Sequence, residues 1–234
     1  MTSYTLKDIF LKLNKGEMNQ VYFLKGDDYF LQEYFIKKVE KYIFGDDASH
    51  RELLMPDDMS SQEIIDRISQ ADLFSSQKYF IIRNPQQIKG KAQDELLQFC
   101  FNPTPNHFLV IIIDDYYSSL KIAKELQKVL GSIDVRKPFE KELRSWTNQL
   151  FADQGIDPPP SVVQAVLDMA GDSVYHIANQ VDKICLGLGE EDKLTPEFVQ
   201  QFSGWNREYQ KWEFLNSVGQ KNLSKALLTG NDYI

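Results

Sequence analysis

Short β-rich runs alternate with helical stretches through the first 137 residues of the chain. Parallel strands need crossover connections of this kind, whereas antiparallel strands can be joined by tight turns. The pattern therefore predicts an α/β domain in which helices flank a parallel five-stranded sheet. The expected strands are residues 21–25, 52–55, 79–82, 108–113 and 133–136.

Past Pro138 no strand-like run appears, and every segment has helical period. Apolar stripes predict three helices, and Thr195-Pro196 predicts the start of a fourth by supplying a cap residue and a proline at the first helical position. The chain breaks again near Ser203-Gly204-Trp205. We therefore expect an α/β domain at residues 1–138 and a helical domain at 139–204. After this break the sequence predicts two more helices. Two helices cannot bury their apolar faces alone, so we expect residues 205–234 to begin a third domain that is truncated.

The charge balance limits the partners that the chain can bind. It has 26 basic and 34 acidic residues, a net charge of −8, which argues against binding duplex DNA mainly by neutralising phosphates. No run reaches the length of about 20 apolar residues that a membrane-spanning helix needs, and no secretory signal is recognisable at the start. We expect a soluble cytoplasmic protein.

Neither histidine nor cysteine forms a pattern of metal ligands. His50, His107 and His176 lie far apart, without a cysteine or glutamate at ligand spacing, and are expected to be surface or packing residues. Cys100 and Cys185 sit beside apolar residues and are expected to be small core side chains. We expect no metal site and no cofactor.

The glycine that follows the first strand is where an α/β nucleotide-binding protein would place its phosphate-binding loop. Counted from Gly26, the positions of the second glycine, the lysine and the hydroxyl residue of a P-loop hold Leu31, Gln32 and Glu33. These residues predict a degenerate nucleotide site that does not bind ATP. A nucleotide hydrolase with an unrecognised site around Gly26 and Asp114 stays open as an alternative.

One polar connection carries two adjacent large apolar residues, Leu73 and Phe74. The two side chains could be buried beneath the loop as part of the core. It could instead be an exposed contact for a partner, because binding residues concentrate on loops that a rigid sheet positions. The residues alone leave both interpretations open.

Four segments, in their order and spacing, resemble the delta subunit family of bacterial DNA polymerase III clamp loaders. The first, YFLKGDDYFL, is a strand with a glycine-acidic turn, and the second, ADLFS, holds the Leu-Phe pair. The other two resemble the first lid helix and the Gly-Asp turn with the last lid helix of that family. The segments are residues 22–31, 71–75, 143–151, and 171–173 with 177–184.

The resemblance implies an AAA+-like fold with a nucleotide site that does not bind ATP, a helical lid, and the start of a helical collar. It implies that Leu73 and Phe74 insert into the sliding clamp, the beta subunit. The chain would be non-catalytic within a complex whose activity is that of a DNA-directed DNA polymerase, a nucleotidyltransferase. Further partners would be the gamma/tau and delta-prime subunits, through the collar, and primer-template DNA only in the assembled complex. The alternative is another inactive subunit such as delta-prime, although the Ser-Arg-Cys triplet and zinc cysteines typical of delta-prime do not appear here.

Overall fold

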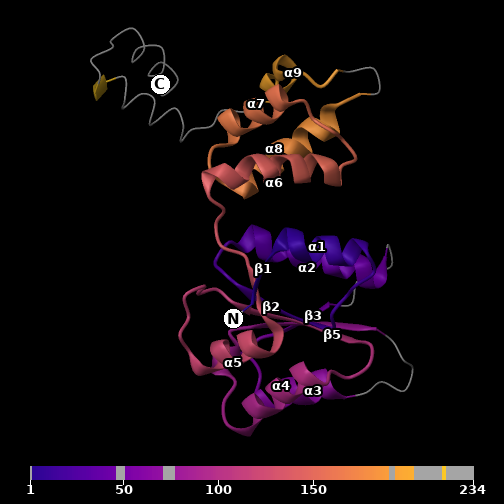
Figure 1. Ribbon diagram of the computed structural model, residues 1–234, viewed down its shortest axis with the longest axis vertical. Helices are drawn as coiled ribbons and strands as arrows, with labels where there is room; N and C mark the ends of the chain where they lie inside the picture. Colours follow the sequence, from indigo (N-terminus) through magenta and orange to yellow (C-terminus); the bar gives the residue numbers. More distant parts are fainter. Residues whose placement is uncertain (1, 46–50, 71–76, 190–192, 203–217, 220–234) are drawn as a thin grey trace. The chain divides into compact units, whose positions relative to one another are not determined.

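The computed structural model describes residues 2–45, 51–70, 77–189, 193–202 and 218–219. The chain divides into two compact units, Met1–Lys137 and Pro138–Ile234 (Figure 1).

The first unit is built on a six-stranded sheet in the order β1-β6-β2-β5-β4-β3, and all its strand pairs are parallel. The α/β class and the parallel sheet are thus confirmed. The sheet has one strand more than the five predicted, because β1 is only three residues long and too short to show an apolar period. The strands are β1 (Ser3–Thr5), β2 (Val21–Lys25), β3 (Arg51–Leu54), β4 (Lys78–Arg83), β5 (His107–Ile113) and β6 (Ser132–Asp134).

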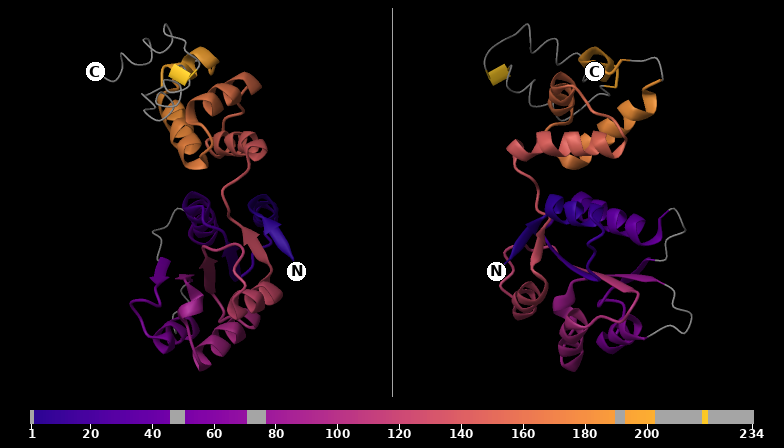
Figure 2. Two further views of the ribbon diagram at one scale, coloured as in Figure 1. Left: turned by 90° about the vertical axis from the view of Figure 1, so that its left-hand side faces the viewer. Right: turned by 45° about the vertical axis from the view of Figure 1, so that its right-hand side comes forward.

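Helices cover both faces of the sheet (Figures 1 and 2). Helices α1 and α2 lie over one face, and α3, α4 and α5 lie over the other. Burial on both sides explains why the central strands read as continuous apolar runs rather than as alternating ones. The helices are α1 (Leu6–Asn14), α2 (Tyr29–Phe44), α3 (Ser61–Ser69), α4 (Lys91–Phe101) and α5 (Lys121–Leu130), with a short 3-10 helix η1 (Pro85–Gln87) after β4.

The strand β2 shows how the two faces divide the core. Val21 and Phe23 belong to the buried cluster that α3, α4 and α5 complete, whereas Tyr22 meets the ring of Phe35 on α2 edge-on, with 5.2 Å between ring centroids. The register of β2 against β5 places Lys25 beside Ile113, so both strands end at the same level. Parallel pairing therefore brings the residues that follow β2, β4 and β5 to one edge of the sheet.

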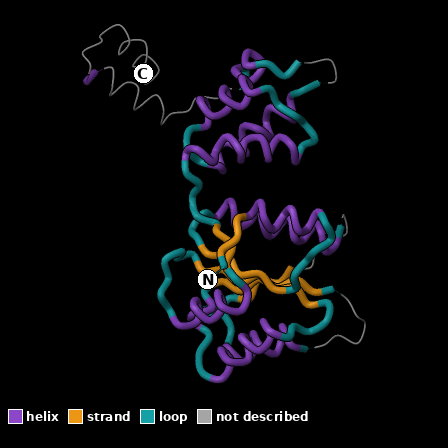
Figure 3. Tube along the Cα trace, in the orientation of Figure 1, coloured by secondary structure: helices purple, strands orange, loops and turns teal. Residues whose placement is uncertain are grey.

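All regular elements in the described residues of the second unit are helices, joined by loops (Figure 3). Helix α6 packs against α7 and α8, and α9 packs against α7. The hydroxyl of Thr195 accepts the N–H of Phe198 at 3.3 Å, which is the cap that the sequence predicts. The helices are α6 (Glu140–Asp153), α7 (Pro160–Ala170), α8 (Val174–Gly187) and α9 (Pro196–Gln200).

Nearly all of the predicted third domain, residues 205–234, lies outside the described residues. Within the described part of the chain, no helix combines the length and the apolar character that crossing a membrane requires.

Candidate functional site

The turn after β2 is closed by contacts within the chain. The N–H of Gly26 donates to the carbonyl of Ile113 at 3.1 Å, and the φ angle of Gly26 is +139°, a conformation that favours glycine. A Cβ at this position would lie 2.4 Å from the backbone nitrogen of Arg136 and from the backbone carbon of Val135. Gly26 is therefore needed for close packing of two backbone segments, and this explains the glycine without a phosphate ligand.

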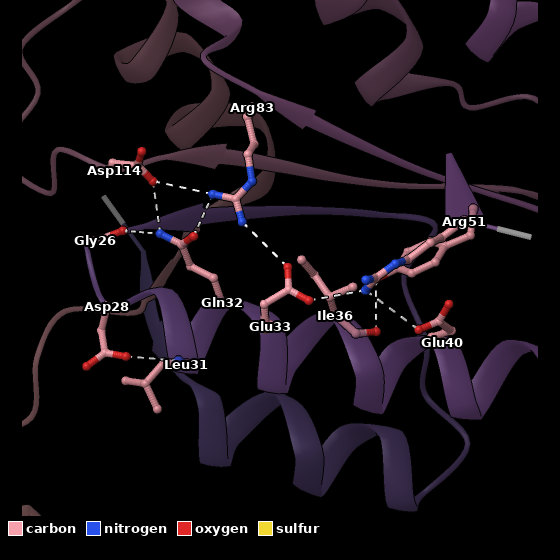
Figure 4. Close-up of polar contacts among 11 residues, drawn as sticks. Gly26, Asp28, Leu31, Gln32, Glu33, Ile36, Glu40, Arg51, Arg83 and Asp114 are labelled. Atoms are coloured by element: carbon pink, nitrogen blue, oxygen red, sulfur yellow. Dashed lines mark hydrogen bonds and ion pairs between the residues drawn. The ribbon is translucent and has the colours of Figure 1, made fainter. Parts of the chain in front are cut away.

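The first turn of α2 is capped by its own chain. The Oδ1 of Asp28 accepts the N–H of Leu31 at 3.0 Å (Figure 4). Leu31 itself is buried in the core. The backbone donors at a helix N-terminus are the groups that would bind a phosphate, and a carboxylate already occupies one of them here.

Gln32 occupies the centre of the predicted degenerate site, and it is 1% exposed. Its Nε2 donates to the carbonyl of Gly26 at 2.8 Å and to Oδ1 of Asp114 at 2.9 Å, while its Oε1 accepts from Nη1 of Arg83 at 2.7 Å (Figure 4). Both amide hydrogens and the amide oxygen are thus used. The side chain ties the end of β2 to the ends of β4 and β5.

Arg83 brings a positive charge to the same place, and the cluster supplies its own counter-charges. Its guanidinium lies 3.7 Å from Oε1 of Glu33 and 3.7 Å from Oδ1 of Asp114, and it lies over the ring of Tyr29 at 5.2 Å. Glu33 also pairs with Arg51 of β3 at 3.2 Å. A polyphosphate would have to displace two carboxylates from this arginine before the arginine could neutralise it.

A second cluster lies at the carboxyl end of β6. Arg136 forms two-pronged hydrogen bonds with Asp134, the shortest of 2.6 Å, and its guanidinium stacks over the ring of Tyr116 at 3.6 Å. Lys25 lies 5.5 Å from the same ring and is 6% exposed. Burial lowers the pKa of Lys25, and nearby Asp115 opposes the shift. Both cations are already engaged by aromatic or acidic neighbours.

Gln32 forms hydrogen bonds with Gly26 and Asp114, and Arg83 contacts both Gln32 and Glu33; that this site does not bind a nucleotide stays a prediction. Arg83 was not predicted at the site, although a charged residue that ends an apolar strand is a signal that could have found it. Among the described residues, no group of three or more His, Cys, Asp or Glu side chains is arranged to hold a metal ion.

The predicted clamp contact, Leu73 and Phe74, lies outside the described residues. The described chain leads to it through α3, which ends at Ser69, and continues from it into β4, which begins at Lys78.

The parallel sheet and its flanking helices are similar to AAA+ folds. A solved structure of a Thermotoga maritima RuvB variant, a protein with such a fold, matches with a TM-score of 0.50 and 11% identity, covering 91% of this chain and 74% of that one. No protein-family model matches the sequence.

Within this class, the chain is similar to DNA polymerase III subunit delta of Bacillus subtilis. The two sequences are 18% identical over 233 residues, which cover 94% of this chain and 67% of the relative. The solved structure of a Bacillus subtilis DNA clamp loader delta protein matches with a TM-score of 0.76 and 16% identity, covering 97% of this chain and 70% of that one. The resemblance to the delta subunit family that the four sequence segments indicate is thus confirmed.

Proposed function

We propose that the chain acts in DNA replication as a clamp-loader subunit of the delta kind, which binds the sliding clamp and favours its open form without hydrolysing ATP. The observation that carries the proposal is the sequence similarity to DNA polymerase III subunit delta over 94% of the chain. This similarity extends through both units, so it is more than a likeness of the α/β sheet.

The contacts around Gln32 support the absence of ATP hydrolysis. The amide that stands where a P-loop has its lysine is committed to Gly26, Asp114 and Arg83. A hydrolase would need phosphate-binding donors and a metal-bound nucleotide at this place. The proposed role needs neither, because the chain would contribute binding energy rather than chemistry.

Leu73 and Phe74 are proposed to bind an apolar pocket of the clamp, an assignment that rests on the resemblance. Burying two such side chains contributes about 3 to 6 kcal/mol gross, which suffices for a binding hot spot. A protein that binds the open ring more tightly than the closed ring shifts the population of rings toward the open form. Additional contacts by neighbouring surfaces would supply the rest of the energy of opening.

The remaining partners follow from the same proposal. The gamma/tau and delta-prime subunits would assemble with the chain through a collar that begins at residues 205–234. The net charge of −8 makes strong binding of DNA by the isolated chain unfavourable, so contact with primer-template DNA would belong to the assembled complex. A replication role places the protein in the cytoplasm.

The experiment that tests the proposal is a pull-down of the sliding clamp of the same organism. Wild type is compared with Leu73→Ala plus Phe74→Ala, and the expected result is loss of the clamp from the double variant. The matched control is Leu53→Ala plus Phe101→Ala, because these side chains are 52% and 70% exposed on β3 and α4 of the same unit. Equal recovery of the clamp by all three proteins would refute the assignment of Leu73 and Phe74.

Titration with a fluorescent ATP analogue tests the nucleotide site separately. We expect no saturable binding with or without Mg²⁺. Saturable, magnesium-dependent binding would favour the hydrolase alternative.

A further inference from the structure

The turn at residues 103–107 contacts the chain on both sides of residues 71–76, the segment that holds the proposed clamp contact. Residues 68–70 and 77–79 are the two stems of this segment. The stems belong to different elements, since the leading stem closes α3 and the trailing stem opens β4. A single turn that binds both stems fixes where the segment leaves and rejoins the described fold.

The leading stem is held by two side chains of this turn. The last carbonyls of a helix lack partners within the helix and need them from elsewhere. Here the carbonyl of Ile68 accepts from Nδ1 of His107 at 2.6 Å, and the carbonyl of Ser69 accepts from the hydroxyl of Thr104 at 3.3 Å. Because a carbonyl oxygen can only accept, Nδ1 of His107 carries the proton. Ile68 and His107 are both buried, which shields their hydrogen bond from water.

The trailing stem is held by the backbone of the same turn. The N–H of Lys78 donates to the carbonyl of Asn106 at 2.9 Å, and Lys78 is the register partner of His107 in the sheet. Asn106 has a φ of +63°, a left-handed conformation that asparagine tolerates better than most residues. His107 therefore contacts both stems.

The turn is itself fixed to the rest of the sheet. The N–H of His107 donates to the carbonyl of Thr104 at 3.1 Å, and the amide of Gln20 donates to the carbonyls of both residues, at 3.0 Å and 3.1 Å. The imidazole ring also meets the ring of Phe80 edge-on, with 5.5 Å between centroids. The turn thus connects the stems to Gln20, the residue before β2, and to Phe80 of β4, which belongs to the buried core.

We propose that His107 and Thr104 are positioning residues for clamp binding. They bind the end of α3 to the turn that also binds the start of β4, and so fix the two stems from which Leu73 and Phe74 are presented. A contact presented from a fixed base loses less conformational freedom on binding than one presented from a loose base. This inference rests on the proposed function, and it adds residues that do not themselves touch the clamp.

The test uses variants that separate hydrogen bonding from packing. His107→Phe keeps a ring against Phe80 but has no donor, whereas His107→Asn keeps a donor near the position of Nδ1 and loses the ring. Thr104→Val removes the hydroxyl from the turn. The matched control is Thr147→Val, which removes a hydroxyl that donates to the carbonyl of Leu143 at 2.9 Å in the second unit.

The measurement is the Kd of the full chain for the sliding clamp of the same organism. Each variant loses one hydrogen bond to the leading stem, and this loss is expected to raise the Kd about fivefold in His107→Phe and in Thr104→Val. His107→Asn should bind more tightly than His107→Phe, and Thr147→Val should bind like wild type. In a Leu73→Ala background, the effect of His107→Phe should shrink, because residues that act through one another are not additive.

The outcomes distinguish this inference from the proposed function. If wild type binds the clamp and the Leu73→Ala plus Phe74→Ala variant does not, while His107→Phe and Thr104→Val bind like wild type, the positioning role is refuted and the function stands. An undiminished effect of His107→Phe in the Leu73→Ala background also refutes it. Absence of clamp binding by wild type refutes both. Should His107→Phe fail to fold by circular dichroism, Thr104→Val, which changes a partly exposed side chain, decides the question.

Discussion

Replacing Gln32 by leucine removes the polar centre of the degenerate nucleotide site while keeping a side chain of similar size. Three hydrogen bonds are lost, one to the carbonyl of Gly26 and two to the charged groups of Asp114 and Arg83. The neutral bond contributes about 1 kcal/mol, and each bond to a charged group contributes about 1.5 kcal/mol or more. We take the low end because the side chain of Asp114 is 58% exposed. The first unit is therefore expected to lose about 4 kcal/mol of its free energy of unfolding.

Urea denaturation of the full chain can resolve this loss. Residues 1–137 contain no tryptophan and Trp146 lies on α6, so tryptophan fluorescence does not report on the first unit, while far-UV circular dichroism follows both units. With a slope of about 2 kcal/mol/M, the loss lowers the urea midpoint of the first unit by about 2 M. The tryptophan transition should stay where it is in wild type.

The matched control for this substitution is Gln62→Leu. Gln62 is exposed on α3, and its amide also donates to two carboxylates, those of Asp66 at 3.1 Å and Glu95 at 3.4 Å. Exposed bonds of this kind exchange readily with water, so Gln62→Leu should cost less than about 0.5 kcal/mol. If Gln32→Leu costs no more than the control, the polar cluster does not hold the strand ends together, and the reasoning is wrong.

Three further predictions concern other sites of the fold. Gly26→Ala should destabilise the first unit by about 3 kcal/mol or more in urea denaturation, because its Cβ would meet backbone atoms at 2.4 Å, whereas Gly90→Ala, with open space around it, should cost about 1 kcal/mol. Burial raises the pKa of Cys100 to about 12, so a thiol reagent at pH 8 should modify the partly exposed Cys185 first and reach Cys100 only on unfolding; equal rates would contradict this. The backbone N–H of Thr5 lowers the pKa of Asp8 below 3.8, so Asp8 stabilises α1 above that pH, and the stability difference between wild type and Asp8→Asn should disappear as the pH falls through the lowered pKa; a difference that persists in strong acid would contradict this.

The sequence is sufficient to predict the strands that lie inside the sheet and the helices with strong apolar stripes. The run at residues 108–113 is apolar throughout because helices cover both faces of the sheet there. Strand β1 could not be predicted in this way, since its three residues pair only with β6 and carry no period of their own. Strand β3, at the other edge, was predicted from the sequence, so it is the shortness of β1 and not its edge position that hides it.

At the site, the absence of the P-loop residues could be recognised directly from the sequence. The contacts that Gln32 makes in place of the P-loop lysine could not. The spacing from Gly26 shows that Gln32 stands in the position of the lysine. Its contacts with Arg83 and Asp114 join residues that are 51 and 82 positions away in the chain. Only the parallel register, which ends β2, β4 and β5 at one edge, brings these side chains together. His107 was likewise classed as a surface or packing residue, because nothing in its neighbourhood in the sequence points to the carbonyl of Ile68.

The most direct measurement is the Kd for the sliding clamp, determined for the full chain in the absence and in the presence of ATP and Mg²⁺. The contacts that fill the nucleotide site and the similarity to delta predict saturable binding with the same Kd in both conditions. Absence of binding, or a Kd that changes with nucleotide, would contradict the proposal that this chain binds the clamp and does not itself bind ATP.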